Sequence, residues 1–376
     1  MKVSCLQEHL AKGLGIVSRA VSTRSTLPVL ANVLLATENG RLKLSATNLE
    51  IVITCWIGAK VEEEGAITIP ARTFQDLINT LPQDQVELRL HEPTLTVHLS
   101  SGRTQANIKG IDAQEFPIVP EPDKEERIRL EADVLRQMIE QVAFAAATDD
   151  ARPALTGVLT TFSGSQAHMA ATDGFRLSLR SAHIPGYVEP DFSIIIPARS
   201  LMDVARVIDD DLEAVYLSMP EGRRQVIFDM DSVVLVSQLI DGTYPDYEAI
   251  LPTRHNTRTV VSTADFRKAC KTADIFARES SNTARIAVEP GEEMSPAFVV
   301  VTATSIETGD NTAQIDASVE GEPIEIAVNV KYMSEVLNVV ETPQVALETT
   351  TPREPGVIRP VGDNDFMHII MPMQFG

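Results

Sequence analysis

The stretch "IPARTFQDLINTL" (residues 69–81) occurs in similar form twice more, as "IPARSLMDVARVI" (196–208) and "VNVKYMSEVLNVV" (328–340). In each copy, apolar residues fall at positions i, i+3, i+4 and i+7. This is the spacing of a helix that buries one face and exposes the other. The sequence therefore predicts three equivalent amphipathic helices and a fold built by repetition.

A second helix type also occurs three times, with apolar residues at positions i, i+4, i+7 and i+11. These residues are Leu10, Leu14, Val17 and Val21, then Leu135, Ile139, Val142 and Ala146, then Phe266, Cys270, Ala273 and Ala277. Alternating segments rich in Val, Ile, Leu and Thr predict strands. They cover residues 41–53, 85–90, 94–99, 192–197, 225–240 and 297–303.

The repeats set the expected domain organisation. Two segments rich in proline and charge, 116–126 and 251–258, have the composition of linkers. We therefore expect three α+β domains, each with two helices packed on an antiparallel β-sheet. Their expected bounds are 1–121, 127–252 and 257–376. A chain of 376 residues is long enough for two or three domains.

The composition is that of a globular protein, with 44% hydrophobic and 23% charged residues. We find no membrane-spanning stretch and no signal-type apolar core, so we expect a cytoplasmic protein. The three cysteines, Cys5, Cys55 and Cys270, are scattered and have no histidines at metal-binding spacing. We expect them to be small buried residues, and we predict no disulfide, metal site or cofactor.

The net charge of −21 argues by itself against an ordinary basic nucleic-acid-binding protein. However, each copy of the first helix type begins with a cation, Arg72, Arg199 or Lys331, where the helix dipole disfavours positive charge. One interpretation is a solvated face in which the cation pairs with the carboxylate four residues later. The other is a divided surface whose cationic side attracts phosphate without reading bases.

Several motifs, in this order and spacing, resemble the bacterial DNA polymerase III beta subunit family, the replicative sliding clamps. They are "STLPVLANVLL" (25–35), "LSATNLEI" (44–51), "IPARTF" (69–74), "ARPALTGVL" (151–159), "ATDGFRLSL" (171–179), "DGTYPDYEAILP" (241–252), "VNVKYMSEVL" (328–337) and "IIMPMQF" (369–375). The resemblance covers the whole chain and implies a head-to-tail homodimer that closes into a ring around duplex DNA. Such a ring acts as a processivity factor, because topology rather than tight contact holds it on DNA.

The resemblance also implies which residues contact DNA. By the family pattern they are Arg24, Arg72, Asp149, Pro153 and Ala154. Arg152, Arg199 and Lys331 join them as further cations of the repeated elements. Asp149 puts an anion at a position that would face phosphate.

A pocket for short peptides of partner proteins is implied between the second and third domains. The partners would be the replicative polymerase, the clamp loader and repair polymerases. The implied pocket residues are Thr172, Gly174, Phe175, Arg176, Leu177, Pro245, Ile250, Asn329, Tyr332, Ile369, Ile370, Met371, Pro372 and Met373. Leu, Ile, Met and Pro walls suit apolar peptide side chains. Phe175 stands where some members have His.

For the ring interface, the family match falls on Ile275 and Phe276, which interrupt the polar side of their helix. The facing edge of the first domain includes Ala106, where some members carry a large aromatic residue.

Two other classes of function remain as alternatives. An enzyme is disfavoured because the seven histidines are scattered, and Asp173 in "ATDG" has no evident acid or base partner. A scaffold that binds peptides without encircling DNA is compatible with the sequence. Release from circular DNA on linearisation distinguishes a ring from such a scaffold.

Overall fold

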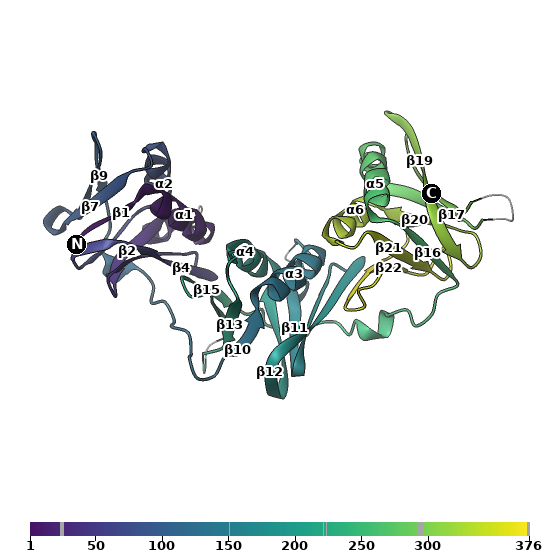
Figure 1. The fold of residues 1–376 in the computed structure, drawn as a ribbon, viewed down its shortest axis with the longest axis horizontal. Coiled ribbons are helices and arrows are strands. Elements are labelled where there is room, and N and C mark those ends of the chain that lie inside the picture. Colours follow the sequence, from purple (N-terminus) through teal and green to yellow (C-terminus); the bar gives the residue numbers. More distant parts are fainter. Residues whose placement is uncertain (23–25, 150, 221, 223, 292–295, 374–376) are drawn as a thin grey trace. The chain divides into compact units, whose positions relative to one another are not determined.

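The computed structural model describes residues 1–22, 26–149, 151–220, 222, 224–291 and 296–373. The chain divides into two compact units. Unit 1 comprises residues 1–133 and 203–239, and unit 2 comprises residues 134–202 and 240–376. Figure 1 shows the elements of both in sequence colours.

Unit 1 contains helices α1 (Gln7–Val17) and α2 (Ala71–Thr80) and two sheets, of five and eight strands. The first sheet has the order β5-β1-β7-β8-β9 and the second β10-β13-β14-β15-β4-β3-β2-β6. The strands are β1 (Lys2–Leu6), β2 (Asn32–Glu38), β3 (Arg41–Thr47), β4 (Ile51–Gly58), β5 (Lys60–Glu63), β6 (Ala66–Pro70), β7 (Gln85–His91), β8 (Thr96–Ser101), β9 (Thr104–Lys109), β10 (Ile128–Glu131), β13 (Ala214–Ser218), β14 (Gln225–Asp229) and β15 (Val233–Gln238).

Unit 2 contains helices α5 (Thr263–Ala277) and α6 (Val330–Val339) and one ten-stranded sheet. Its order is β11-β12-β23-β22-β21-β16-β19-β18-β17-β20. The strands are β11 (Gly157–Thr172), β12 (Arg176–Pro197), β16 (Thr257–Ser262), β17 (Thr283–Glu289), β18 (Phe298–Ser305), β19 (Gly309–Glu320), β20 (Ile324–Asn329), β21 (Gln344–Thr349), β22 (Gly356–Pro360) and β23 (Phe366–Ile370). Helices α3 (Ala132–Val142) and α4 (Ala198–Val207) have residues in both units.

The predicted helices are all present. In α2 the apolar stripe is buried through Phe74 and Ile78, both 0% exposed, and in α6 through Met333 and Leu337. Figure 1 shows α1 beside α2, and α5 beside α6, over their strands. In each pair the apolar stripes pack onto a sheet, which is how the periodic pattern becomes a core.

The second helix type is shorter than predicted in its first two copies. Helix α1 ends at Val17 and continues as a 3₁₀ turn, η1 (Ser18–Ala20), so Val21 lies beyond it. Helix α3 likewise ends at Val142 and continues as η5 (Ala143–Ala145). Buried apolar residues in a tightened turn keep the apolar spacing for a few residues, so periodicity overestimates the α-helix.

Two predicted strands are each a pair of strands joined by a turn. Segment 41–53 contains β3 and the start of β4, and segment 225–240 contains β14 and β15. In the first turn Leu49 has φ 77° and in the second Asp231 has φ 63°. Neither turn contains glycine, which is the usual residue at positive φ, so neither position carries a clear turn signal.

Both large sheets join strands from different predicted domains. In unit 1, β4 pairs with β15, with Ile53 opposite Leu235. In unit 2, β12 pairs with β23, with Leu177 opposite Ile369. Sheet hydrogen bonds therefore run across both predicted domain borders.

The three cysteines are free and buried, as predicted. Burial raises the pKa of the Cys55 thiol to about 11, so it stays protonated near neutral pH. Among the helices in the described ranges, none is both long and apolar enough to span a membrane.

Candidate functional site

A tight turn between β11 and β12 positions the polar side of the predicted peptide pocket. Thr172 Oγ1 donates to the Arg176 carbonyl at 2.5 Å and accepts from the Gly174 N–H at 3.0 Å. One carboxylate oxygen of Asp173 accepts from the N–H groups of Phe175 and Arg176. Gly174 has φ 93°, which glycine adopts without strain. Local side-chain bonds thus fix the turn.

Unit 1 contains the same turn at the start of β4. Thr47 Oγ1 donates to the Ile51 carbonyl at 2.9 Å and accepts from the Leu49 N–H at 3.0 Å. Asn48 replaces Asp173 and accepts from two N–H groups in the same way. The repeated hydrogen-bond pattern is structural support for duplication of this segment.

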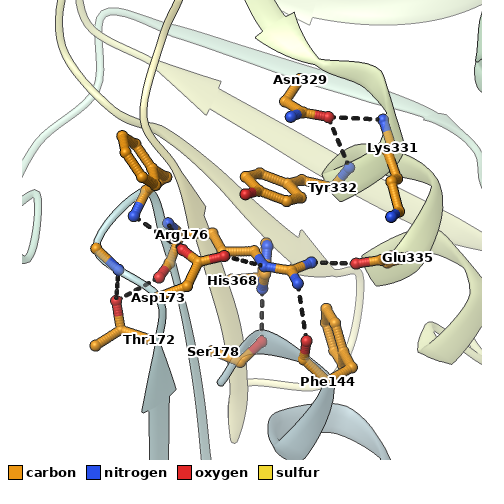
Figure 2. Close-up of polar contacts among 12 residues, drawn as sticks. Phe144, Thr172, Asp173, Arg176, Ser178, Asn329, Lys331, Tyr332, Glu335 and His368 are labelled. Carbon is orange, nitrogen blue, oxygen red and sulfur yellow. Dashed lines mark hydrogen bonds and ion pairs between the residues drawn. The ribbon is translucent and has the colours of Figure 1, made fainter. Parts of the chain in front are cut away.

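Arg176 is the centre of the polar site (Figure 2). Its side chain is only 8% exposed and forms ion pairs with Asp173, at 3.1 Å, and with Glu335. Its Nη2 donates to the Phe144 carbonyl at 2.8 Å. Two carboxylates and a carbonyl therefore satisfy a nearly buried guanidinium, which is costly to bury without partners.

Helix α6 supplies the other wall. Asn329 caps the helix by accepting from the N–H groups of Lys331, at 3.0 Å, and Tyr332, at 3.3 Å. The Tyr332 ring lies 4.1 Å from the Arg176 guanidinium carbon, a cation–π contact. Burial, with nearby Asp173, raises the pKa of the Tyr332 hydroxyl.

Below this polar layer lies an apolar cluster of Leu177, Val357 and Ile369, all at most 3% exposed. Tyr247 and Leu251, from the segment that follows unit 1, pack against it. Leu177 and Ile369 of this cluster, the apolar floor, belong to the pocket that the family resemblance implies, and Val357, directly opposite Ile369, is an addition to that set.

The C-terminal segment is held in place by two backbone bonds. The Met371 N–H donates to the Phe175 carbonyl at 2.9 Å, and the Met373 N–H donates to the Ala327 carbonyl at 2.8 Å. Phe175 is 62% exposed and Met371 is 40% exposed. Large apolar groups at the surface beside a polar network are what a peptide site requires.

The structure brings most of the predicted pocket residues together in unit 2. Ile370 is the exception in orientation, because it is buried in the core beneath α5 and α6. Pro245 and Ile250 are exposed on the segment that carries Tyr247, with Ile250 ending the turn η7 (Glu248–Ile250). Pro372 is half-buried between Met371 and Met373.

Sequence reasoning missed several residues of the site. Phe144 contributes a backbone carbonyl, which no side-chain pattern reveals. One of the two interpretations paired Glu335 with Lys331 four residues before it, but Glu335 pairs with Arg176. Similarly, Asp203 pairs with Arg206 rather than Arg199.

His368 was also missed. It is completely buried, shares a 2.6 Å hydrogen bond between Nδ1 and Ser178 Oγ, and stacks on Phe144 with ring centroids 5.4 Å apart. Burial, with a smaller contribution from Arg176, lowers the pKa of His368 from 6.5 to about 3. The imidazole is therefore neutral in the folded protein.

A stability test follows from this burial. In the unfolded chain, His368 binds a proton below pH 6.5. In the folded chain, it binds a proton only below about pH 3. As the pH is lowered from 6.5 to about 3, the protonation of His368 in the unfolded chain should therefore reduce the free energy of unfolding, by up to about 1.4 kcal/mol for each pH unit. Urea unfolding of His368→Gln at successive pH values should show a shallower fall. The exposed His183→Gln is the matched control, and equal slopes in all three proteins would refute the assignment.

The predicted DNA-contacting cations differ in their surroundings. Arg72, Arg199 and Lys331 each occupy the second residue of a helix, are exposed, and form no ion pair within the part of the chain that the structure describes. Arg24 lies outside the described residues. By contrast, Lys12 of α1 pairs with Asp209, and Arg19 of η1 pairs with Asp203.

The loop after α3 is tied to the peptide site. Arg152 donates from Nη2 to the Asp173 carbonyl at 2.9 Å, so its guanidinium is engaged by the pocket turn. Asp149 accepts from the Ala151 N–H at 3.1 Å. Pro153 is exposed at the start of η6 (Pro153–Thr156), and Ala154 packs on a small apolar cluster.

Two of the strand edges in the described sheets carry or adjoin the predicted ring-interface residues. Strand β9, with half-buried Ala106, ends its sheet and pairs only with β8. Strand β19 pairs with β18 over 309–316 and with β16 only over 317–320. On nearby α5, Ile275 is 59% exposed, whereas Phe276 packs partly against the core.

Comparison with known proteins gives a consistent family. Models of the DNA polymerase III beta subunit match its N-terminal domain at residues 1–120, its central domain at 129–246 and its C-terminal domain at 248–374. The chain is similar to the beta sliding clamp of Bacillus subtilis strain 168, with 30% identity and 100% of both chains covered. It is 32% identical to that of Synechococcus elongatus, over 100% of this chain and 99% of the relative.

Solved structures agree with these relatives. The fold is similar to the Bacillus subtilis DNA polymerase sliding clamp, with a TM-score of 0.92 and 29% identity over 100% of both chains. It is also similar to a Pseudomonas aeruginosa sliding clamp bound to griselimycin, with a TM-score of 0.90 and 27% identity over 100% of both chains.

Proposed function

Because the chain belongs to the DNA polymerase III beta subunit family, the beta sliding clamps, we propose that it is a DNA sliding clamp. Two copies join head to tail as a ring, encircle duplex DNA and tether the replicative polymerase. The exposed cations at the starts of α2, α4 and α6 carry this proposal. In a chain of net charge −21, a repeated cation at an unfavourable helix end suits loose attraction to phosphate.

The proposed ring consists of three domains per copy, with the bounds 1–121, 127–252 and 257–376. The three separately matched family models support this division. The role is one of binding rather than catalysis, and its setting is the cytoplasm, where replication partners act.

A peptide pocket is the second part of the proposal. Partner proteins, namely the polymerase, the clamp loader and repair polymerases, would insert short apolar segments over Leu177 and Ile369. The griselimycin bound to the Pseudomonas aeruginosa relative supports a ligand site on clamps of this family. In this chain the polar layer around Arg176 would meet the peptide backbone.

Linearising the DNA tests the ring. The purified protein, loaded by a clamp loader on a nicked circular plasmid, should survive a high-salt wash and leave when the plasmid is cut once. High salt weakens phosphate contacts but cannot break a topological link. Retention on the linear plasmid would favour ordinary DNA binding, and failure to remain on the circle would favour a scaffold that never encircles DNA.

The proposed ring interface predicts a strong effect of Ile275→Asp. The open edges of β9 and β19 can pair between copies, with Ile275 and Phe276 beside the seam. Each ring has two such seams, and each loses the burial of one Ile side chain, about 1.5–3 kcal/mol. The dimer dissociation constant should rise more than about 100-fold, as measured by analytical ultracentrifugation. Ile118→Asp, at a residue that is 90% exposed, is the control, and an unchanged dimer in Ile275→Asp would exclude this seam.

A further inference from the structure

A basic cavity lies on the outer face of the unit 2 sheet. It has a volume of about 230 Å³ and is lined by Arg254, His255, Glu348, Val357 and Arg359, with prolines and threonines completing the wall. The helix-covered face carries Leu347 and Ile358 of the same strands, so the cavity faces away from α5 and α6.

The cavity holds more cations than its own carboxylate neutralises. Glu348 accepts from Arg359 Nε at 3.2 Å and forms an ion pair with Arg258 Nε at 3.4 Å, and His255 Nδ1 lies 3.9 Å away. Together with exposed Arg254, the three arginines outnumber Glu348 and Glu320, which lies opposite Arg258 on β19, so these five side chains carry a net formal charge of +1. Like charges gathered in this way repel unless an anion joins them.

The guanidinium groups remain available. Arg258 and Arg359 are 31% and 35% exposed, and in the described chain their terminal Nη groups have no hydrogen bond of their own. The carboxylate of a ligand can therefore bind these Nη groups while Glu348 remains in contact with both Nε atoms. Arginine's forked geometry favours such paired contacts.

The cavity is continuous with the proposed peptide pocket. A row of directly opposed residues crosses five strands on one face: Leu177, Ile369, Val357, Glu348 and Arg258. Val357 belongs both to the apolar floor and to the cavity wall. From Leu177 to Glu348 there are three strand spacings, about 14 Å, which an extended peptide covers in about four residues.

We propose that this basic cavity binds acidic residues of partner peptides, about four residues from the apolar segment that enters the pocket. The inference rests on the proposed peptide-binding function and adds the chemistry of the flanking sequence. The occupant is a carboxylate-bearing peptide because the cavity adjoins the peptide floor and lies on the face opposite the helix-start cation Lys331.

Two pairs of labelled peptides test the proposal by fluorescence anisotropy at low salt. All four peptides contain the apolar segment Leu-Leu-Phe joined through a four-residue Gly-Ser spacer to three Glu or three Gln residues. In one pair the Glu or Gln residues follow the apolar segment, and in the other pair they precede it. The Glu form should bind about five-fold tighter than its Gln partner at one of the two ends, since each partly exposed pair contributes little. Added salt should reduce the difference.

Variants locate the effect. The Arg254→Gln/Arg359→Gln protein should lose the preference for Glu, and Arg254→Lys/Arg359→Lys should keep part of it. Arg278→Gln, at an exposed arginine elsewhere in unit 2, should leave it unchanged. Glu348→Gln removes the competing carboxylate and should increase the preference.

The outcomes separate the cavity from the pocket. Equal binding of the Glu and Gln peptides, or a preference that survives in Arg254→Gln/Arg359→Gln, overturns the cavity assignment and leaves the peptide pocket intact. Absence of binding by every peptide overturns the pocket and the cavity together. A double variant that loses retention on circular plasmid but keeps the Glu preference assigns the cavity to nucleic acid, which also overturns the proposal.

Discussion

Arg176→Ala is expected to destabilise the protein and to weaken peptide binding. The substitution leaves Asp173 and Glu335 without their shared cation and removes the donor to the Phe144 carbonyl. Breaking a buried ion pair by removing one partner costs about 3–5 kcal/mol. A loss of this size should lower the melting temperature by roughly 10 °C in calorimetry. Peptide affinity should fall at least about tenfold, because the turn and Tyr332 lose their common contact.

Two further variants show which property of Arg176 causes the loss of stability and of peptide affinity. Arg176→Lys keeps the charge but cannot bond three acceptors in a fork, so its melting temperature should lie between those of wild type and Arg176→Ala. Arg199→Ala removes an exposed arginine and should leave stability and peptide binding near wild type. Equal melting temperatures for Arg176→Ala and the wild type would show that the ion pairs and hydrogen bond of Arg176 do not stabilise the site.

Neutralising the three helix-start cations is expected to change how DNA affinity depends on salt. In Arg72→Gln/Arg199→Gln/Lys331→Gln, each lost phosphate contact should reduce the slope of log K against log salt by about 0.9, or about 2.7 per protomer if all three contact DNA. Direct titration of a fluorescent duplex at several salt concentrations measures this slope. Retention on closed circles should persist, because a closed ring holds by topology.

The matched control neutralises cations that are already paired. Lys12 pairs with Asp209, Arg19 with Asp203, and Arg278 with Asp274. Replacing these three by Gln removes the same formal charge from surfaces where carboxylates already offset it. If both triple variants changed the slope equally, net charge alone would explain DNA attraction, and the helix-start positions would have no special role.

The repeated helices were predictable because burial of one helix face imposes its period on the sequence. Where the chain tightens into 3₁₀ turns after Val17 and Val142, the period continues but the α-helix does not. The hairpin turn at Leu49 was missed because its positive φ is stabilised by side chains of Thr47 and Asn48 rather than by glycine.

Site residues were predictable only where family motifs identified them. The resemblance supplied Thr172, Arg176 and Tyr332, but it gave no account of what holds Arg176 in place. That depends on Phe144 and Glu335, which become neighbours only through tertiary packing. His368 required knowledge of the register that sets it opposite Ser178.

The spacing of charged residues along the helices was a poor guide to which residues form ion pairs. A cation followed four residues later by a carboxylate predicts an ion pair within the helix. In α4 and α6 the carboxylates instead pair with Arg206 and Arg176. In α6 the partner Arg176 is 8% exposed and held by packing, so it loses less side-chain entropy on pairing than exposed Lys331 would. In α4, Asp203 pairs with Arg206 three residues later and with Arg19 of η1.

Sheet pairing across the predicted borders has a consequence for how such a chain can be shortened or split. Five registered pairs join β4 to β15, and five more join β12 to β23. A single protease cut between residues 117 and 127 should leave both fragments associated, as in a split protein that reassembles. A gene that encoded only residues 1–121 would expose the edge of β4 and favour aggregation. Although the three predicted domains have similar sequences, the strand pairing between them means that one cannot simply replace another.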